Sequence, residues 1–369
     1  MCFKKHYLKL FTKILLFPFA VIYGFIIWLR NWMYKSNFIG STDFEIPVFT
    51  IGNLSMGGTG KTPFVEMLIE LLHDRYHIGV LSRGYKRKTT GYIDVQPTHN
   101  AKEVGDEPLM LKLKYPMVHV SVGEQRVFAI PQLLGKYPET KVILLDDAFQ
   151  HQSVRPDINI LLTTYDKPFY DDLILPLGTL REFESGKSRA NIIVMTKCPK
   201  NITDTEQQQI ISKIKPAANQ KVFFCTIEYG VPYNILNPTD RLDLNNHNNQ
   251  LLITGIASAN LLKTYLDETA KEIVHFNFDD HHFFEQHELE NIRKNYPEFT
   301  NWITTEKDGV RLAFHKNWLL ENNISLYCLP MKTRLIGNNA ADFAETVRGF
   351  LDYFYKDENE IEGQTQTNH

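Results

Sequence analysis

The chain has 369 residues, 43% of them apolar, and a formal net charge of −3. This length suits two domains with packed cores, and the near-neutral charge without a broad basic stripe argues against nucleic acid as a partner. Four cysteines occur without a Cys-x-x-Cys pair, so neither a zinc site nor a disulfide framework is indicated, and a reducing compartment is expected.

The first 35 residues form an apolar segment with basic ends. The stretch from Ile14 to Leu29 carries no charged residue, and lysine or arginine residues flank it on both sides. As a helix it covers roughly 24 Å, less than the roughly 30 Å hydrocarbon core of a bilayer. A signal peptide would need a small-residue cleavage site, which the sequence lacks, and a buried core helix rarely carries cations at both ends. We therefore predict that residues 1–35 anchor the chain to a membrane, either spanning it or lying in its interface.

Beyond this segment, apolar strands alternate with helices in two successive sets. The first set comprises strands at Val48–Ile51, Ile78–Ser82, Val118–Val122, Val142–Leu145, Asn159–Leu162 and Ile192–Thr196 and helices at Lys61–Arg75, Asp106–Lys114, Gln125–Gly135 and Asp204–Ile214. The second comprises strands at Val222–Ile227, Leu251–Gly255, Ile273–Phe276, Thr300–Thr304 and Ser325–Leu329 and helices at Ser258–Thr269, from Gln286, and at Ala340–Tyr355. The pattern predicts an α/β fold: a core with a parallel sheet at residues 36–225, a smaller α/β domain at 226–355, and a polar, disordered tail at 356–369.

Residues 55–62 read Ser-Met-Gly-Gly-Thr-Gly-Lys-Thr and lie between the first predicted strand and the helix that begins at Lys61. Glycines in such a turn let the backbone approach phosphate oxygens closely, and the N-terminus of the following helix favours an anion. Lys61 can reach the β- and γ-phosphates, and the Thr62 hydroxyl can bind Mg²⁺. A tight strand–helix connection alone would not need these two side chains. We predict a nucleotide site formed by Ser55, Met56, Gly57, Gly58, Thr59, Gly60, Lys61 and Thr62, with Ser55 where the usual pattern has glycine.

Two carboxylates, Asp146 and Asp147, directly follow the apolar run Val142–Leu145. Because the strands of such a sheet end beside the phosphate loop, we predict that these acids lie at a Mg²⁺ site. A turn or helix cap is the plainer alternative. Gln150 and His151 come next and would face the same cleft.

Three further polar segments allow more than one interpretation. Asp106 and Glu107 open a predicted helix, where acids are ordinary capping residues, but an ionised Asp106 could also take a proton from an attacking hydroxyl. The run 279–282, Asp-Asp-His-His, suggests a metal ligand, a proton relay or a surface loop, and lacks the i, i+4 histidine spacing of helical metal sites. In the run 196–199, Thr-Lys-Cys-Pro, proline replaces the acid that reads guanine in GTPases, which favours adenine or an unselective base pocket.

Taken together, these segments resemble tetraacyldisaccharide 4′-kinase, the lipid A 4′-kinase family of Gram-negative bacteria. The similarity runs from the N-terminal segment to about Leu312 and rests on motifs at Ile51–Pro63, Leu81–Tyr85, Gly105–Pro108, Leu145–His151, Leu175–Glu182, Asp280–His282 and Thr305–Asp308. Departures are mild: Ala148 stands where glycine is frequent, and residues 255–258 read Gly-Ile-Ala-Ser instead of Gly-Ile-Gly/Ala-Asn-Pro.

The resemblance implies a reaction. The γ-phosphate of ATP would pass to the 4′-hydroxyl of an acylated disaccharide 1-phosphate, a lipid A precursor embedded in the membrane. The enzyme would meet this lipid at the membrane surface, on the cytoplasmic face of the inner membrane, where residues 1–35 hold it. The resemblance implies no particular oligomeric state.

The resemblance also implies roles for individual residues. Asp106 becomes the expected base, His281 its partner from the second domain, and Lys61 a catalytic phosphate contact. The candidates for Mg²⁺ or nucleotide contacts are Thr62, Glu107, Asp146, Asp147, Gln150 and Glu182. Arg83 and Tyr85 become candidates for substrate contact.

Two other functions fit the patterns less closely. A membrane-anchored P-loop GTPase or ATPase switch should carry an acid after Lys197, where Pro199 stands. A non-catalytic nucleotide-binding scaffold would tolerate the loss of Asp106, because its binding would rest on Lys61 and the loop backbone.

Overall fold

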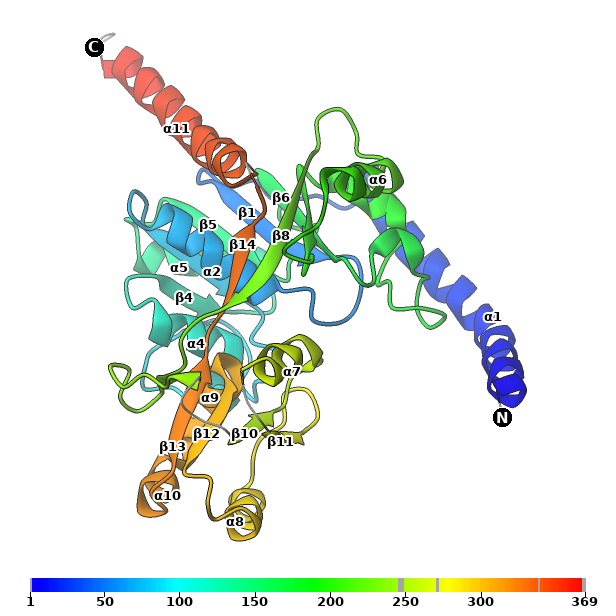
Figure 1. The fold of residues 1–369 in the computed structure, drawn as a ribbon. Helices are drawn as coiled ribbons and strands as arrows, with labels where there is room; N and C mark the ends of the chain where they lie inside the picture. Colours follow the sequence, from blue (N-terminus) through cyan, green and yellow to red (C-terminus); the bar gives the residue numbers. More distant parts are fainter. Residues whose placement is uncertain (1, 245–248, 270–271, 338, 367–369) are drawn as a thin grey trace.

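The structure is a computed structural model that describes residues 2–244, 249–269, 272–337 and 339–366. Within these residues the chain forms a large sheet of nine strands and a smaller sheet of five, with helices packed on both (Figure 1). A long N-terminal helix, α1 (Cys2–Lys35), and a long C-terminal helix, α11 (Asn339–Gln366), project from the body at opposite ends of the view. The predicted α/β fold with two sheets and an N-terminal apolar helix is confirmed.

The large sheet is parallel except at its two edges. Its order is β14-β8-β7-β6-β1-β5-β2-β4-β3, and the edge strands β3 and β14 run antiparallel to their neighbours. The strands are β1 (Val48–Asn53), β2 (Ile78–Ser82), β3 (Ile93–Asp94), β4 (His119–Val122), β5 (Val142–Asp146), β6 (Ile158–Thr164), β7 (Ile192–Thr196), β8 (Lys221–Tyr229) and β14 (Met331–Leu335). β1 lies between β5 and β6, so the loop that leaves β1 lies beside the residues that follow β5.

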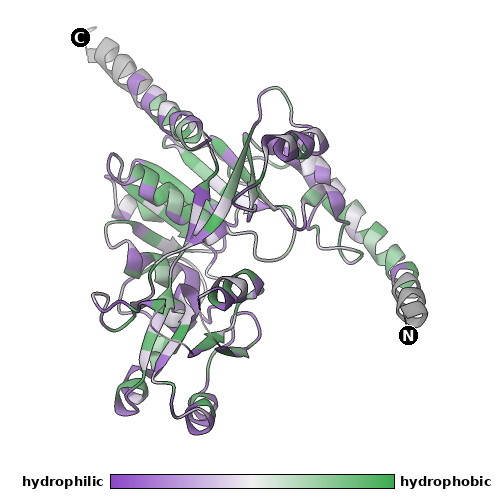
Figure 2. Cartoon of the chain, viewed as in Figure 1, coloured by the Kyte–Doolittle hydropathy of each residue, from purple (hydrophilic) through white to green (hydrophobic). Residues whose placement is uncertain are grey.

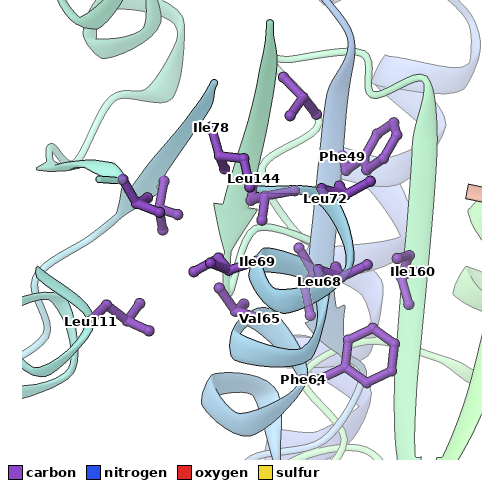
Figure 3. Packing of buried hydrophobic residues seen from close by; sticks show 14 of the residues in the cluster. Phe49, Phe64, Val65, Leu68, Ile69, Leu72, Ile78, Leu111, Leu144 and Ile160 are labelled. Atoms are coloured by element: carbon purple, nitrogen blue, oxygen red, sulfur yellow. The ribbon is translucent and has the colours of Figure 1, made fainter. Parts of the chain in front are cut away.

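Both faces of this sheet are buried, which is why its central strands are apolar throughout. Along β5, Val142 and Leu144 belong to the core under α2, whereas Ile143 and Leu145 belong to the core under α5. Figure 3 shows the α2 side, where side chains of that helix pack onto β1, β2, β5 and β6. The helices of this part are α2 (Lys61–Leu72), α3 (Ala101–Val104), α4 (Asp106–Lys114), α5 (Arg126–Lys136) and α6 (Asp204–Ile214), with 3₁₀ turns at Phe169–Asp171 and Glu184–Arg189.

The smaller sheet has the order β11-β10-β12-β13-β9 and is parallel except for β9. Its strands are β9 (Tyr233–Asn234), β10 (Asn249–Thr254), β11 (Glu272–Asn277), β12 (Asn301–Thr305) and β13 (Ser325–Leu329). The helices are α7 (Asn260–Asp267), α8 (Gln286–Asn295), α9 (Glu306–Leu312) and α10 (Lys316–Glu321), with a 3₁₀ turn at Ala313–His315. Fully buried Trp302 is the largest side chain of its core.

The predicted limits of the smaller domain, 226–355, do not match the strand pairing. β8 was expected to open that domain, but it pairs with β7 in the large sheet. After β13 the chain returns, and β14 pairs with β8 over the register Met331–Tyr229 to Leu335–Cys225. α11 then places Phe343, Val347 and Leu351 in the core under α2. The smaller unit is therefore an insertion between β8 and β14. The elements on either side of it, β8 before it and β14 and α11 after it, pack with the large sheet.

The tail predicted to be disordered also differs. The helix α11 continues to Gln366, so the backbone from Lys356 to that residue is helical. Glutamate, which recurs at positions 358, 360 and 362, is a good helix former.

Candidate active site

The phosphate loop leaves β1 and enters α2 as predicted. Gly57 and Gly60 have φ angles of 116° and 83°, a left-handed region that side chains disfavour. Gly60 is the N-cap of α2, so the first N–H groups of that helix lie at the loop. The hydroxyl of Thr196, at the end of β7, donates to the carbonyl of Thr59 (2.8 Å) and holds the loop against the sheet. Residues 55–62 therefore form the compact, glycine-dependent turn that a phosphate-binding loop requires.

Lys61 contacts the acid that follows β5. Its Nζ lies 3.7 Å from Asp147 Oδ1 and 3.4 Å from Asn53 Oδ1. Arg181 also reaches Asp147, with 2.9 Å between Nη2 and Oδ1. Burial disfavours the carboxylate, but Lys61 and Arg181 outweigh it and hold the pKa of Asp147 at about 2. Thr62, the other residue expected to contact metal, is half-buried one position further along α2.

Asp146 differs sharply from its neighbour. It is 2% exposed, and its Oδ1 is buried with no hydrogen-bond partner in the described part of the chain. Burial, together with the negative charges of Glu107 and Asp147, raises the pKa of Asp146 to about 7. A buried carboxylate oxygen without a donor is costly unless a cation or proton satisfies it. This is the chemistry of a Mg²⁺ ligand, so the donor set fits the predicted ion.

Among the residues described, no group of three His, Cys, Asp or Glu side chains lies close enough together to hold a metal ion. Mg²⁺ beside a nucleotide is commonly held by one or two carboxylates together with phosphate oxygens and water.

Glu182 and Gln150 form a separate cluster beside α1. Glu182 accepts from Arg189 at 2.7 and 2.8 Å, from Gln150 at 2.9 Å and from Asn31 of α1 at 3.0 Å. Gln150 also donates to the carbonyl of Asn53 at 2.8 Å. In this arrangement Glu182 joins α1 to the core, and its expected contact to Mg²⁺ or nucleotide remains a prediction.

Asp106, at the start of α4, and His281, in the turn between β11 and α8, come from different units and meet. His281 Nδ1 lies 2.9 Å from Asp106 Oδ2, and both side chains are buried. The other oxygen, Oδ1, accepts from the backbone N–H of Glu107 at 2.9 Å. Burial opposes ionisation, but the His281 hydrogen bond and the Lys307 charge hold the pKa of Asp106 below its usual range. The structure thus brings together the two residues that the resemblance paired.

The segment 279–282 is a turn whose two histidines point to different partners. His281 has a φ of 59°, and its N–H donates to the carbonyl of Gly255 at 2.9 Å. A left-handed conformation is uncommon for a non-glycine residue and requires support from its surroundings. His282 Nε2 lies 2.8 Å from Glu288 Oε2. Of the two histidines only His281 reaches Asp106, so this segment supplies a partner for that acid, and its function as a relay, a metal ligand or a plain loop stays a prediction.

Two cations near this pair were not predicted. Lys307 Nζ lies 3.0 Å from His281 Nε2 and 3.0 Å from Glu107 Oε1. Arg311 Nε lies 3.6 Å from Asp106 Oδ2, and its guanidinium also pairs with Asp308. Both cations lie on α9 (Glu306–Leu312); the segment Thr305–Asp308 at its start was one of the motifs of the family resemblance, but no role was assigned to it. Its position at the end of a strand and the start of a helix is the feature of the sequence that could have indicated a functional role.

Of the residues predicted to contact substrate, Tyr85 lies beside this pair. The ring of Tyr85 contacts the ring of His281 edge-on, with 4.9 Å between centroids. Lys86 donates to the carbonyl of Asp280 at 2.9 Å, so the loop after β2 reaches the smaller domain. Arg83 is exposed at the start of that loop. A Cβ on Gly58 of the phosphate loop would lie 4.0 Å from Ala257, also of the smaller domain.

α1 packs against the same region. Tyr23 donates to the carbonyl of Arg181 at 2.8 Å, and Arg30 donates to the carbonyl of Gln150 at 2.6 Å. The stretch Lys13–Lys35 is long and apolar enough to cross a membrane, and 11% of its most apolar window is buried. In Figure 2 the described part of α1 beyond the body is largely hydrophobic. A cavity of about 670 Å³ separates the end of α1 from the sheet and includes no residue of the phosphate loop.

A phosphate loop after β1, acids after β5 and a buried acid–histidine pair supplied by a second domain define a P-loop phosphotransferase. The sequence profile of tetraacyldisaccharide-1-P 4′-kinase (LpxK) matches residues 12–351. The chain therefore belongs to the tetraacyldisaccharide 4′-kinase family, and it phosphorylates this lipid A precursor. The family implies membrane association, and the interpretation as a GTPase or ATPase switch is set aside.

Individual relatives agree. A tetraacyldisaccharide 4′-kinase of Flavobacterium johnsoniae is 43% identical over 345 residues, which cover 93% of this chain and 98% of the relative. One of Bacteroides thetaiotaomicron is 37% identical over 363 residues, which cover 94% and 95%. Among solved structures, LpxK from Aquifex aeolicus, described as a complex with ATP, is similar with a TM-score of 0.69. It is 27% identical, and the match covers 90% of this chain and 98% of that one.

Proposed function

We propose that this kinase binds ATP with Mg²⁺ at the phosphate loop and that Asp106 takes the proton from the 4′-hydroxyl of the lipid. The contact between Asp106 and His281 carries this proposal, because it places a buried, ionised acid with a histidine partner at the junction of the two sheets. A general base must be unprotonated at the operating pH, and the lowered pKa of Asp106 meets that requirement.

For the nucleotide, the support is the geometry of residues 55–62 and the ATP named for the Aquifex aeolicus structure. Lys61 would leave Asp147 for the β- and γ-phosphates, since both are anionic partners for one ammonium group. Thr62, Asp146 and Asp147 would hold Mg²⁺, with Glu107 nearby. The ion would neutralise charge on the transferring phosphoryl group.

The 4′-oxygen bonds to the γ-phosphorus while its proton passes to a carboxylate oxygen of Asp106, and the bond from the γ-phosphorus to the β–γ bridging oxygen breaks to release ADP. Catalysis of such transfers rests mainly on positioning and charge neutralisation. Closure of the smaller sheet over the phosphate loop would exclude water, and the proximity of Ala257 to Gly58 supports such an arrangement.

Substrate delivery is the task we assign to α1. Its exposed apolar residues would lie in the membrane, and its hydrogen bonds to the Arg181 and Gln150 carbonyls fix that membrane surface close to the site. ATP is soluble and the acceptor is a lipid, so a site beside the anchor meets both. Because the cell's ATP pool is cytoplasmic, we place the kinase on the cytoplasmic face of the inner membrane.

The test is incubation of the full chain with γ-labelled ATP, Mg²⁺ and tetraacyldisaccharide 1-phosphate in mixed micelles. We expect one new phosphate monoester at the 4′ position, found by mass spectrometry and phosphorus NMR. Omission of Mg²⁺ should abolish the product, and Asp106→Asn should slow it while leaving ATP bound. Transfer that survives metal chelation, or an Asp106→Asn variant with unchanged kcat, would overturn these assignments.

A further inference from the structure

The ammonium group of Lys307, on α9, contacts the imidazole ring of His281. Its Nζ lies 3.0 Å from His281 Nε2, while His281 Nδ1 lies 2.9 Å from Asp106 Oδ2. Nε2 therefore has the Lys307 ammonium as its nearest partner, with Asp280 Oδ2 further away at 3.7 Å, whereas Nδ1 faces the Asp106 carboxylate. Lys307 is 17% exposed and is held in place by Glu107 at 3.0 Å and Asp280 at 3.6 Å.

The chemistry of these groups fixes the position of the imidazole proton. A lysine ammonium carries three donors and no acceptor, so a hydrogen bond between it and Nε2 requires Nε2 to be unprotonated. A doubly protonated imidazole would set two donors, both charged, against each other at 3.0 Å. The remaining ring proton must lie on Nδ1, where it is donated to Asp106. In this arrangement Asp106 is the acceptor of the His281 hydrogen bond.

We infer that Lys307 is a positioning residue that fixes the Nδ1–H tautomer of His281 and thereby leaves Asp106 as the group that takes the substrate proton. This inference rests on the proposed function and deepens it. Because Nδ1 already carries a proton toward Asp106, the proton of the 4′-hydroxyl cannot pass through Asp106 onto that nitrogen. It goes to a lone pair of the carboxylate, which the His281 hydrogen bond keeps oriented.

The His281–Asp106 and Lys307–Glu107 contacts both depend on the position of the smaller unit relative to α4. Asp106 and Glu107 are consecutive at the start of α4, and their partners His281 and Lys307 belong to the smaller unit. When α9 is in place, Lys307 reaches both Glu107 and the imidazole. Movement of the smaller unit away from α4 would break the His281–Asp106 and Lys307–Glu107 contacts together, so the Nδ1 proton meets its acceptor only in the assembled site.

The test combines nitrogen NMR with kinetics on the full chain. In ¹⁵N-histidine-labelled protein, with His281 assigned by comparison with His281→Gln, we expect an unprotonated Nε2 and a protonated Nδ1. In Lys307→Met the signal should move to a mixture of tautomers or to the imidazolium. The value of kcat should fall about 10- to 100-fold, the size typical for loss of a partner that orients a functional histidine. Lys307→Arg, which retains a cationic donor, should restore most of the tautomer signal and part of kcat.

Lys114→Met is the matched control. Lys114 also joins the two units through a buried ion pair, to Glu66 at 2.5 Å and Glu306 at 2.9 Å, but does not touch His281. It should leave the His281 nitrogen signals unchanged. A wild-type signal with the proton on Nε2, or an unchanged signal in Lys307→Met, would overturn the inference. The NMR readout needs no turnover, so a failure of Asp106 as base would appear separately, as normal kcat in Asp106→Asn.

Discussion

Lys61 Nζ lies 3.7 Å from Asp147 Oδ1, so the cation expected to grip phosphate is paired with an acid expected to hold the metal. The pair is 17% and 39% exposed, which leaves both groups accessible to a ligand. An incoming triphosphate with its metal would exchange one ion pair for two, because the ammonium can bind phosphate while the carboxylate binds the cation.

Loss of the Lys61 ammonium group should therefore lower kcat strongly and change the stability of the fold little. We predict that Lys61→Ala lowers kcat by about 10²- to 10³-fold, the size typical for one preorganised donor to a transition state. The measurement is labelled-phosphate transfer to the lipid at saturating ATP. Lys332→Ala, which removes a half-exposed partner of Glu70, is the control and should be nearly silent. A Lys61→Ala variant that transfers phosphate at a near-normal rate would contradict the assignment of the loop.

Buried Glu66 gives a pH-dependent prediction for stability. Burial and the nearby Glu306 raise the pKa of Glu66 to about 7 although Lys114 opposes them, since one lysine faces two glutamates. A raised folded-state pKa means that the folded state binds a proton that the unfolded state has released. The stabilisation that protonated Glu66 contributes is fully present below its unfolded-state pKa of 4.5. It is lost as the pH rises through the folded-state pKa of about 7.

Glu66→Gln cannot titrate and lacks this slope. Its stability relative to wild type should therefore rise between pH 5 and pH 8, by an amount on the order of a few kcal/mol. Thermal unfolding of both proteins at four pH values measures the difference. A Tm difference that stays constant from pH 5 to pH 8 would show that Glu66 does not titrate in this range.

The exposed apolar residues of α1 should determine membrane binding. Phe17, Ile22 and Phe25 are each more than half exposed and lie on the same helix as Tyr23, which contacts the core. Replacing the three with Asp should move the protein off vesicles in a flotation assay, because a charge within the bilayer costs up to about 3 kcal/mol per residue. ATP affinity should be retained. Leu320→Asp, at an exposed position on α10, is the control; equal flotation of wild type and the triple variant would rule out this role of α1.

The packing of α11 under α2, far from the site, should contribute to the free energy of unfolding. Leu351 of α11 is fully buried in the core under α2. Leu351→Ala should lower the free energy of unfolding by about 2–5 kcal/mol, whereas Glu345→Ala on the exposed face should change it by about 0.5 kcal/mol or less. Urea unfolding measures both. Equal effects of the two substitutions would mean that α11 does not pack there.

The sequence predicted what local patterns determine. β2, β7 and β13 and the helices α4 and α6 have the predicted limits, because apolar runs and capping residues mark their ends. The phosphate loop and the acids after β5 were predicted because sheet topology brings these strand ends together.

Contacts between distant segments could not be predicted in this way. β14 reads Met-Lys-Thr-Arg-Leu and pairs with β8, about a hundred residues earlier, which no local pattern indicates. Lys307 and Arg311 lie in an ordinary charged helical turn, and only the packing of α9 against α4 brings them to Asp106. The pairing of His281 with Asp106 came from the family resemblance; spacing alone left both residues with plain structural alternatives.

The central claim is that Asp106 and His281 act as one unit in proton removal, and a double-mutant cycle on kcat tests it most directly. We predict that Asp106→Asn lowers kcat by about 10²- to 10⁴-fold, that His281→Gln lowers it less, and that the double variant is no slower than Asp106→Asn alone. Losses that multiply in the double variant would contradict the account, because they would show that the two residues contribute independently.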